Sequence, residues 1–244
     1  MAKITLVLGG ARSGKSVFAE RLAKKYNDVV YIATAETRDD EMRERVRLHR
    51  ERRPRNWKTI ESPLHVDKVV SDLNGTDGLV LIDCITLYVT NLLLRGDPDV
   101  ESGQRPVAPL PAKGLDSPHS SSPSRKSTMD DRAFSPLLTG TGAGAEEKIF
   151  SNQKTHPDGC TGMQTGNPQE RQQVILSKIR KLGQVCRESG SDVILISNEV
   201  GLSIVPDNAL SREFRDIAGY ANQILAGEAN EVYFMVAGIA QRIK

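Results

Sequence analysis

A glycine-rich stretch near the N-terminus has the residue types that bind a phosphate group. Its residues are Gly9, Gly10, Ala11, Arg12, Ser13, Gly14, Lys15 and Ser16, which fit the spacing G-x-x-x-x-G-K-[ST]. Glycines let the backbone fold tightly, so that successive N–H groups and a helix N-terminus point at an anion. The ammonium of Lys15 would reach the β- and γ-phosphates of a nucleotide, and the hydroxyl of Ser16 would bind Mg²⁺. The motif predicts nucleotide binding.

An acidic residue further along the chain supplies a second predicted metal ligand. Asp83 follows Leu79–Ile82, four apolar residues that read as a buried strand. An acid at the end of such a strand is typical of the carboxylate that holds Mg²⁺, directly or through water, in phosphoryl-transfer enzymes. Many buried strands end in Asp, but the glycine-rich motif upstream strengthens this interpretation. Ser16 and Asp83 are therefore the predicted Mg²⁺ ligands.

Thr34, Ala35 and Glu36 are further candidates for nucleotide contact. They follow Val29–Ala33, another apolar run that predicts a buried strand. Open α/β sheets bind ligands at the carboxyl ends of their strands, beside the phosphate loop. Thr34 fits equally well as a residue that simply ends a strand, and both interpretations stay open.

Residues 38–53 form a charged segment with helical spacing. The segment contains seven arginines and five acids, and Met42, Val46 and His49 fall on one face. One interpretation is a solvated helix with a packed histidine on a narrow apolar stripe. So many arginines also suit a site that handles two phosphorylated ligands.

The elements that must position these residues alternate along the chain. Apolar runs predict strands at 4–8, 29–33, 57–61, 79–83, 193–197 and 232–236, with a short edge strand at 241–244. Helical spacing predicts helices at 17–26, 38–53, 66–73, 86–95, from 168 to near 190, and from 206 to 225. Strands that alternate with helices predict an α/β protein of the P-loop NTPase fold, with a mostly parallel sheet and helices on both faces.

The stretch 96–168 differs in composition from the rest of the chain. It contains nine of the twelve prolines, nine glycines and nine serines, but only eleven residues of Val, Ile, Leu, Met, Phe or Tyr. Such a stretch buries too little apolar surface to offset the entropy lost on ordering. We therefore predict one domain, 1–244, interrupted by a disordered insertion at 96–168.

The overall composition excludes several classes of function. The net charge of the 244 residues is +2 and no basic stripe is present, which argues against nucleic-acid binding. No apolar run reaches the length of a membrane span. The chain enters its first predicted strand directly, which leaves no room for a signal peptide. Its three cysteines form neither a zinc spacing nor a disulfide framework, so a cytoplasmic location is expected.

Several stretches together resemble one family, the bifunctional adenosylcobinamide kinase / adenosylcobinamide-phosphate guanylyltransferases of cobalamin biosynthesis. The matching stretches are Gly9–Ser16, Tyr31–Ala35, Asp40–Met42 with His49 and Arg53–Pro54, Leu81–Thr86 with Thr90–Asn91, Ser197–Gly201, Ile204–Asn208, Arg212–Gly219 and Ala237–Lys244. They occur in family order and cover nearly everything outside 96–168. Two features depart from the family: the long insertion, and Tyr220, which stands where an arginine is expected.

The resemblance implies two successive reactions. The enzyme would phosphorylate the aminopropanol hydroxyl of adenosylcobinamide with ATP or GTP, and then transfer GMP from GTP to adenosylcobinamide phosphate through a GMP–histidine intermediate. His49 matches the guanylylated histidine. The positions that match GTP-binding residues are Gly9 to Ser16, Thr34, Ala35, Glu36, Arg50, Glu51, Arg52, Arg53, Glu61 and Asp83. The resemblance also implies a P-loop fold and a homotrimer.

The chemistry of His49 agrees with that role. A nucleophilic histidine must be neutral, and neighbouring arginines disfavour the imidazolium and stabilise the pentavalent phosphorus. The alternative is a single-function P-loop kinase for a small metabolite. Such a kinase would explain Lys15 and Asp83, but it would leave His49 without a role. A non-enzymatic nucleotide-switch module is a further alternative, which the near-neutral charge disfavours as a nucleic-acid binder.

Overall fold

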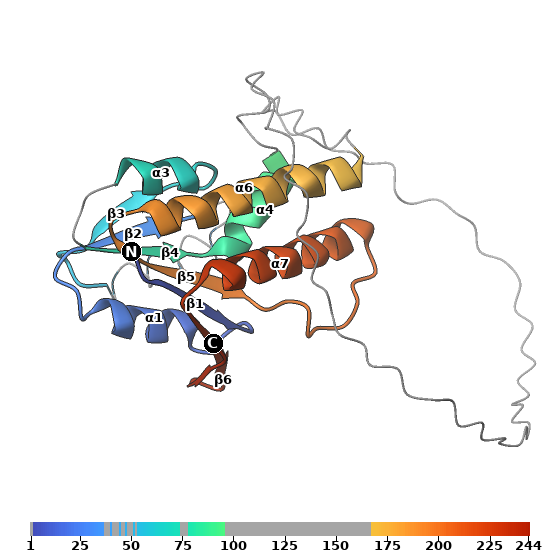
Figure 1. Cartoon of the computed structure of the whole chain (residues 1–244). Helices are drawn as coiled ribbons and strands as arrows, with labels where there is room; N and C mark the ends of the chain where they lie inside the picture. Colours follow the sequence, from blue (N-terminus) through green and yellow to red (C-terminus); the bar gives the residue numbers. More distant parts are fainter. Residues whose placement is uncertain are drawn as a thin grey trace, which may run out of the picture. The chain divides into compact units, whose positions relative to one another are not determined.

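The computed structural model of this protein describes residues 2–36, 40, 44, 47, 51, 53–73, 78–95 and 167–244. The helices and strands in these ranges are shown in Figure 1. In chain order they are β1 (Ile4–Gly9), α1 (Lys15–Ala23), β2 (Val29–Ala33), β3 (Lys58–Glu61), α3 (Val66–Asp72), β4 (Leu79–Asp83), α4 (Ile85–Arg95), α6 (Pro168–Glu188), β5 (Asp192–Asn198), α7 (Ala209–Glu228), β6 (Glu231–Val236) and β7 (Ile239–Arg242).

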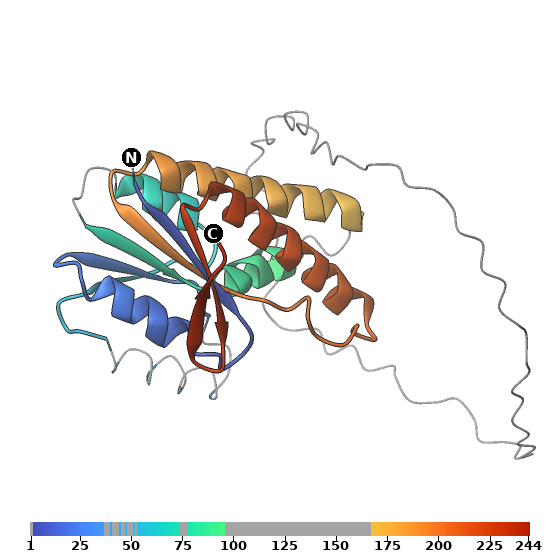
Figure 2. The ribbon, with the colours of Figure 1, turned by 60° about the horizontal axis from the view of Figure 1, so that its bottom comes forward.

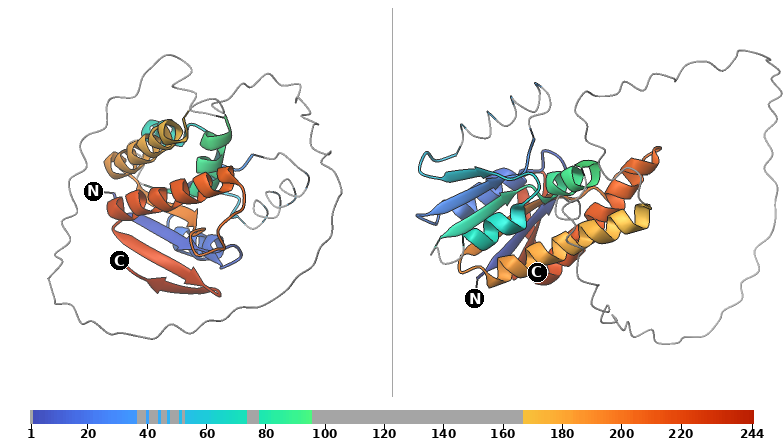
Figure 3. Two further views of the ribbon diagram at one scale, coloured as in Figure 1. Left: turned by 90° about the vertical axis from the view of Figure 1, so that its right-hand side faces the viewer. Right: turned by 90° about the horizontal axis from the view of Figure 1, so that it is seen from above.

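Seven strands form one sheet in the order β3-β2-β4-β5-β1-β6-β7. Every neighbouring pair is parallel except β6 and β7, which form an antiparallel hairpin at one edge. Figure 3 shows this hairpin in red at the edge of the sheet, in its left view. Strand β5 lies between β1 and β4, so one strand separates the phosphate-loop motif from Asp83. The predicted mostly parallel α/β fold is confirmed.

Helices cover both faces of the sheet, but unequally. Of the helices that the structure describes, α1 lies on one face, while α3, α4, α6 and α7 cover the other, as Figures 1 and 2 show. Side chains alternate between faces along each strand, so Ile4, Leu6 and Leu8 pack with the four helices and Val7 packs with α1. Burial of each such aliphatic side chain contributes about 1.5–3 kcal/mol of transfer free energy. Two cores therefore hold the strands, and with them the strand ends, in fixed positions.

The two long helices begin at asparagine caps. Asn167 accepts a hydrogen bond from the Gln169 N–H at 3.1 Å, and Pro168 occupies the first turn, as the sequence predicts. The predicted start of the last helix at 206 is wrong, because α7 begins at Ala209. The side chain of Asn208 accepts from the Ser211 N–H at 2.7 Å and sets that boundary.

The predicted insertion, 96–168, lies outside the described residues except for its last two. Asn167 and Pro168 belong to the start of α6, so the predicted boundary is two residues too long. The prediction of a single domain over 1–244 stays a prediction. Among the described residues, no helix combines the length and the apolar character needed to cross a bilayer.

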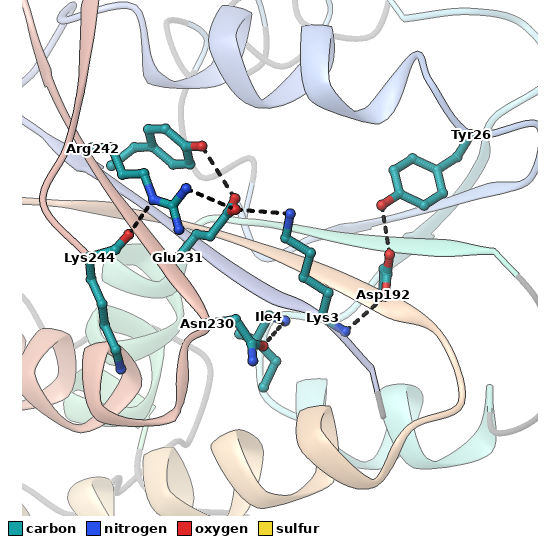
Figure 4. Close-up of polar contacts among 9 residues, drawn as sticks. Lys3, Ile4, Tyr26, Asp192, Asn230, Glu231, Arg242 and Lys244 are labelled. Atoms are coloured by element: carbon teal, nitrogen blue, oxygen red, sulfur yellow. Dashed lines mark hydrogen bonds and ion pairs between the residues drawn. The ribbon is translucent and has the colours of Figure 1, made fainter.

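A polar network ties the amino ends of the central strands together, as Figure 4 shows. Glu231 forms an ion pair with Lys3 at 3.1 Å and another with Arg242 at 3.4 Å. Nearby, the hydroxyl of Tyr26 donates to Asp192 at 2.7 Å. These contacts lie at the opposite end of the strands from the phosphate-loop motif, so they serve stability.

Replacing Glu231 by glutamine should lower stability at neutral pH but not in acid. The hydrogen bond from Lys3 and the charges of Lys3 and Arg242 lower the pKa of the Glu231 carboxyl. The stabilisation is therefore present above the ordinary glutamate pKa of about 4.3 and is lost as the pH falls through the lower folded-state pKa. We expect a deficit of up to about 1 kcal/mol at neutral pH, measured by urea unfolding. A deficit that persists below pH 3 would contradict this assignment.

Candidate functional site

The phosphate-loop motif connects the carboxyl end of β1 to the start of α1. Gly9 ends the strand, and α1 begins at Lys15. Gly14 has φ +94°, in the left-handed region that favours glycine, and a Cβ there would lie 3.2 Å from the Cα of Gly238. The ammonium of Lys15 donates to the carbonyl of Gly10 at 2.6 Å. The loop thus has the strand–loop–helix context that the motif requires.

The turn between β6 and β7 supports this loop from one side. The Gly238 N–H donates to the Ser13 carbonyl at 3.0 Å. A Cβ on Gly9 would lie 2.7 Å from the carbonyl oxygen of Met235 in β6. The phosphate loop therefore packs directly on the C-terminal hairpin, which the motif itself did not predict.

The two predicted metal ligands come together. The hydroxyl of Ser16 in the first turn of α1 donates to Oδ2 of Asp83 at 3.4 Å, across the intervening strand β5. A hydroxyl beside a carboxylate fits Mg²⁺, which takes oxygen ligands and is usually bound by one or two carboxylates together with substrate phosphates. In the described ranges no three His, Cys, Asp or Glu residues gather as a metal cluster.

Tyr31 is the second partner of Asp83. Its hydroxyl donates to the same Oδ2 atom at 2.6 Å, and the residue is only 2% exposed. Burial, and next the charge of Asp83, raise the pKa of the Tyr31 phenol well above its ordinary value, so the phenol stays protonated and acts as a donor. The guanidinium carbon of Arg53 lies 3.3 Å from the centroid of the Tyr31 ring.

Thr34 is fully buried and binds the backbone that follows β4. Its hydroxyl donates to the Cys84 carbonyl at 2.7 Å and accepts from the Cys84 N–H at 2.8 Å. Its own N–H donates to the Asp83 carbonyl at 3.1 Å, and the Asn91 side chain donates to the Thr34 carbonyl at 2.8 Å. The side chain of Thr34 thereby fixes the backbone beside Asp83. A direct contact between Thr34 and nucleotide stays a prediction.

Replacing Thr34 by valine should destabilise the protein by about 1–3 kcal/mol, because it leaves the buried N–H of Cys84 without its hydrogen-bond partner. Thr34→Ser retains the hydroxyl and serves as the control. Urea unfolding of both variants measures the difference. Equal stability of the two variants would show that these hydrogen bonds contribute nothing.

The remaining candidate residues divide into three groups. Ala35 and Glu36 are half-buried beyond β2, where Arg95 pairs with Glu36 at 2.9 Å. Glu61 is exposed at the end of β3, in register with Ala33. Ala11 and Arg12 are exposed, and Glu51 is exposed and paired with Arg47. The last three candidates lie outside the described residues: His49, Arg50 and Arg52.

The sequence alone does not single out Tyr31 or Asn91 as individual site residues. The hydroxyl of Tyr31 within an otherwise apolar strand indicates that it needs a hydrogen-bond partner. Which residue is that partner depends on the order of the strands. Tyr31 pairs with Leu81 and Ala33 with Asp83 in the β2–β4 register, so Tyr31 and Asp83 point to the same face. Tyr220, the departure from the family pattern, is 48% exposed on α7 and away from these contacts.

The cysteines in the described ranges add no nucleophile to the site. Cys84 follows Asp83 directly but is buried, and burial raises the pKa of its thiol to about 12. Burial likewise raises the pKa of Cys186 to about 12. Both thiols therefore stay protonated and unreactive at neutral pH.

Comparisons with known proteins agree with this geometry. Residues 5–116 and 148–243 match the family described as cobinamide kinase / cobinamide phosphate guanyltransferase. The bifunctional adenosylcobalamin biosynthesis protein CobU of Escherichia coli (strain K12) is 35% identical over 242 residues, which cover 98% of each chain. The protein of the same name from Salmonella typhimurium (strain LT2) is 34% identical over 241 residues and 98% of each chain.

A third relative comes from a different bacterium and has a different name. The bifunctional adenosylcobalamin biosynthesis protein CobP of Pseudomonas aeruginosa is 32% identical over 240 residues, covering 98% of this chain and 96% of the relative. These matches span both the phosphate loop and the C-terminal hairpin that supports it. With a phosphate loop, a paired hydroxyl and carboxylate, and relatives matched over nearly their whole length, the chain belongs to the cobinamide kinase / cobinamide phosphate guanyltransferase family.

Proposed function

We propose that this chain carries out both reactions of its family with residues at the carboxyl edge of the sheet. Its family membership makes it a transferase with kinase and guanylyltransferase activities. The observation that carries the assignment of residues is the convergence of Lys15, Ser16 and Asp83 at the end of β1 and β4. Three groups suited to phosphate and Mg²⁺ meet there from two parts of the chain, the start of α1 and the end of β4.

The first reaction is phosphoryl transfer to adenosylcobinamide. Lys15 and the N–H groups of residues 9–16 would hold the β- and γ-phosphates of ATP or GTP. The aminopropanol hydroxyl attacks the γ-phosphorus, a new O–P bond forms, and the bond to the bridging β–γ oxygen breaks as the hydroxyl proton leaves. Held by Ser16 and Asp83, Mg²⁺ would supply charge neutralisation on the phosphates.

The second reaction is guanylyl transfer through His49. A ring nitrogen of His49 would attack the α-phosphorus of GTP, forming a P–N bond while the α–β bridging bond breaks and pyrophosphate leaves. A phosphate oxygen of adenosylcobinamide phosphate then attacks the same phosphorus and the P–N bond breaks. Contacts to GTP are proposed for Thr34–Glu36, Arg50–Arg53 and Glu61. The sequence supports these roles, and Arg53 lies beside Tyr31 at the same edge of the sheet.

A homotrimer and a cytoplasmic location complete the proposal. Both follow from the sequence analysis, the first through family resemblance and the second through cysteine usage. Light scattering on the purified protein measures the mass of the assembly directly. A monomeric mass would contradict the proposed trimer without bearing on the chemistry.

Product analysis tests the two activities together. The purified chain is incubated with adenosylcobinamide, ATP and Mg²⁺, and then with GTP, and the corrinoid products are identified by mass spectrometry. The proposal predicts the phosphorylated corrinoid first and the GDP-linked corrinoid only after GTP is added. If phosphorylation occurs and no guanylylated product follows, the chain acts as a single-function kinase and the proposed role of His49 is wrong.

A further inference from the structure

Tyr31 has two different partners on its two chemically distinct parts. Its hydroxyl donates to Oδ2 of Asp83 at 2.6 Å, and the guanidinium of Arg53 lies 3.3 Å from the centre of its ring. The residue lies in β2 and is 2% exposed, whereas its partners Asp83 and Arg53 are half-buried. One side chain therefore touches a carboxylate from β4 and a cation from the segment before β3.

These partners belong to different halves of the proposed chemistry. Asp83 is the proposed metal carboxylate of the kinase reaction. Arg53 ends the arginine-rich segment 38–53, which carries His49 four residues earlier. Tyr31 contacts both of them.

The Tyr31 ring is a direct partner of the Arg53 guanidinium. The Nε atom of Arg53 is buried and has no hydrogen-bond partner within the part of the chain that the structure describes. A guanidinium over an aromatic face is attracted by the negative potential of the ring, by more when the pair is removed from water. The position of Arg53 therefore depends on the Tyr31 ring rather than on the Tyr31 hydroxyl.

The Tyr31 hydroxyl is not needed for packing in the core. Tyr31 belongs to the core beneath α1, together with Val29, Leu79 and Leu81. Phenylalanine would fill the same space in that core. The hydroxyl instead meets Asp83 at the atom that also accepts from Ser16, and it limits the orientations that the carboxylate can adopt.

We propose that Tyr31 is a positioning residue shared by the two reactions: its hydroxyl orients Asp83 and its ring seats Arg53. This inference rests on the proposed function, because that function gives Asp83 and Arg53 their roles. The hydroxyl and the ring of Tyr31 can be removed in two steps. Tyr31→Phe removes the hydroxyl alone, and Tyr31→Leu removes the ring as well.

The hydroxyl is tested by nucleotide binding rather than by turnover. A fluorescent ATP analogue is titrated with and without Mg²⁺, and the ratio of the two dissociation constants measures how strongly the metal tightens binding. Tyr31→Phe should reduce this ratio about tenfold, since a hydrogen bond to a charged group is lost. An unchanged ratio in a folded Tyr31→Phe protein would overturn this half of the proposal.

Tyr26→Phe provides a matched control. Tyr26 also donates to a carboxylate, Asp192, at 2.7 Å, but at the opposite end of the strands. Its removal should lower the melting temperature and leave the Mg²⁺ ratio as in the wild type. If both variants change the ratio equally, the effect of Tyr31 is merely structural.

The ring is tested by the NMR signal of the Arg53 Nε–H group. Arg53→Lys assigns the signal by its disappearance. Ring currents should shift it upfield in the wild type and in Tyr31→Phe, and the shift should vanish in Tyr31→Leu. A wild-type signal at the position of exposed arginines would overturn this half, even if Tyr31→Leu fails to fold.

The proposed nucleotide site and the proposed role of the Tyr31 hydroxyl can be contradicted separately. If the wild type does not bind the ATP analogue, or Mg²⁺ does not tighten the binding, the proposed nucleotide site is wrong. If the wild type shows Mg²⁺-dependent binding and Tyr31→Phe matches it, the site stands and the role of the Tyr31 hydroxyl is wrong.

Discussion

Replacing Lys15 by alanine should lower the rate of adenosylcobinamide phosphorylation by about 10²- to 10³-fold, the usual loss when a group that stabilises transition-state charge is removed. The Lys15 ammonium lies at the start of α1, within reach of the loop carbonyl of Gly10. Charge develops on the oxygens around the γ-phosphorus during transfer, and Lys15 is the loop residue placed to neutralise it. Steady-state assays with saturating ATP, Mg²⁺ and adenosylcobinamide measure the loss.

Lys15→Arg is the control for charge alone. It keeps the positive charge but replaces a compact ammonium by a planar guanidinium, so we expect partial activity at most. Melting curves of both variants establish that they are folded, which matters because Lys15 is largely buried. Near-normal turnover of a folded Lys15→Ala protein would contradict the assignment of the phosphate loop.

Replacing His49 by alanine should abolish the covalent GMP adduct and guanylyl transfer. The P–N bond cannot form without the ring nitrogen, so the loss should reach the background of the assay. Phosphorylation of adenosylcobinamide should survive in part, because in-line γ-phosphoryl transfer requires no histidine. His49→Asn tests the same point with a smaller change in polarity. Gel analysis of denatured protein after incubation with labelled GTP measures the adduct.

A competing interpretation makes His49 a packed residue on the face it shares with Met42 and Val46. That interpretation predicts lower stability for His49→Ala, with the adduct still formed. The two interpretations therefore differ in the expected stability of His49→Ala and in whether the GMP adduct forms. A variant that melts like the wild type and carries no label supports catalysis, whereas a destabilised variant with normal label supports packing.

The sequence predicted the central strands well because they are buried on both faces. Continuous apolar runs such as Val29–Ala33 and Leu79–Asp83 have few alternatives to a central parallel strand, and both have the predicted bounds. The convergence of Ser16 with Asp83 was also predictable, since both follow strands whose carboxyl ends meet at one edge. Motif and strand pattern agree at this point.

Contacts that depend on strand order could not be predicted in the same way. The bond between Tyr31 and Asp83 requires β2 beside β4 and a particular register, which a single sequence does not specify. The sequence allows two interpretations of Thr34, and its hydrogen bonds to Cys84 depend on the same neighbouring strands, β2 and β4. The starts of helices are harder to predict than the bounds of buried strands. At α7, Asp207 and Asn208 both follow Pro206 and both could cap the helix, and the structure shows that Asn208 does so.

Two labelled forms of GTP show whether one chain combines a phosphate-loop kinase with a GMP–histidine intermediate. Wild-type protein is incubated with Mg²⁺ and GTP labelled on either the α- or the γ-phosphate, then denatured and washed. We predict label on the protein from α-labelled GTP only, stable in base and released by acid. Label from γ-labelled GTP, or none from either form, would contradict it.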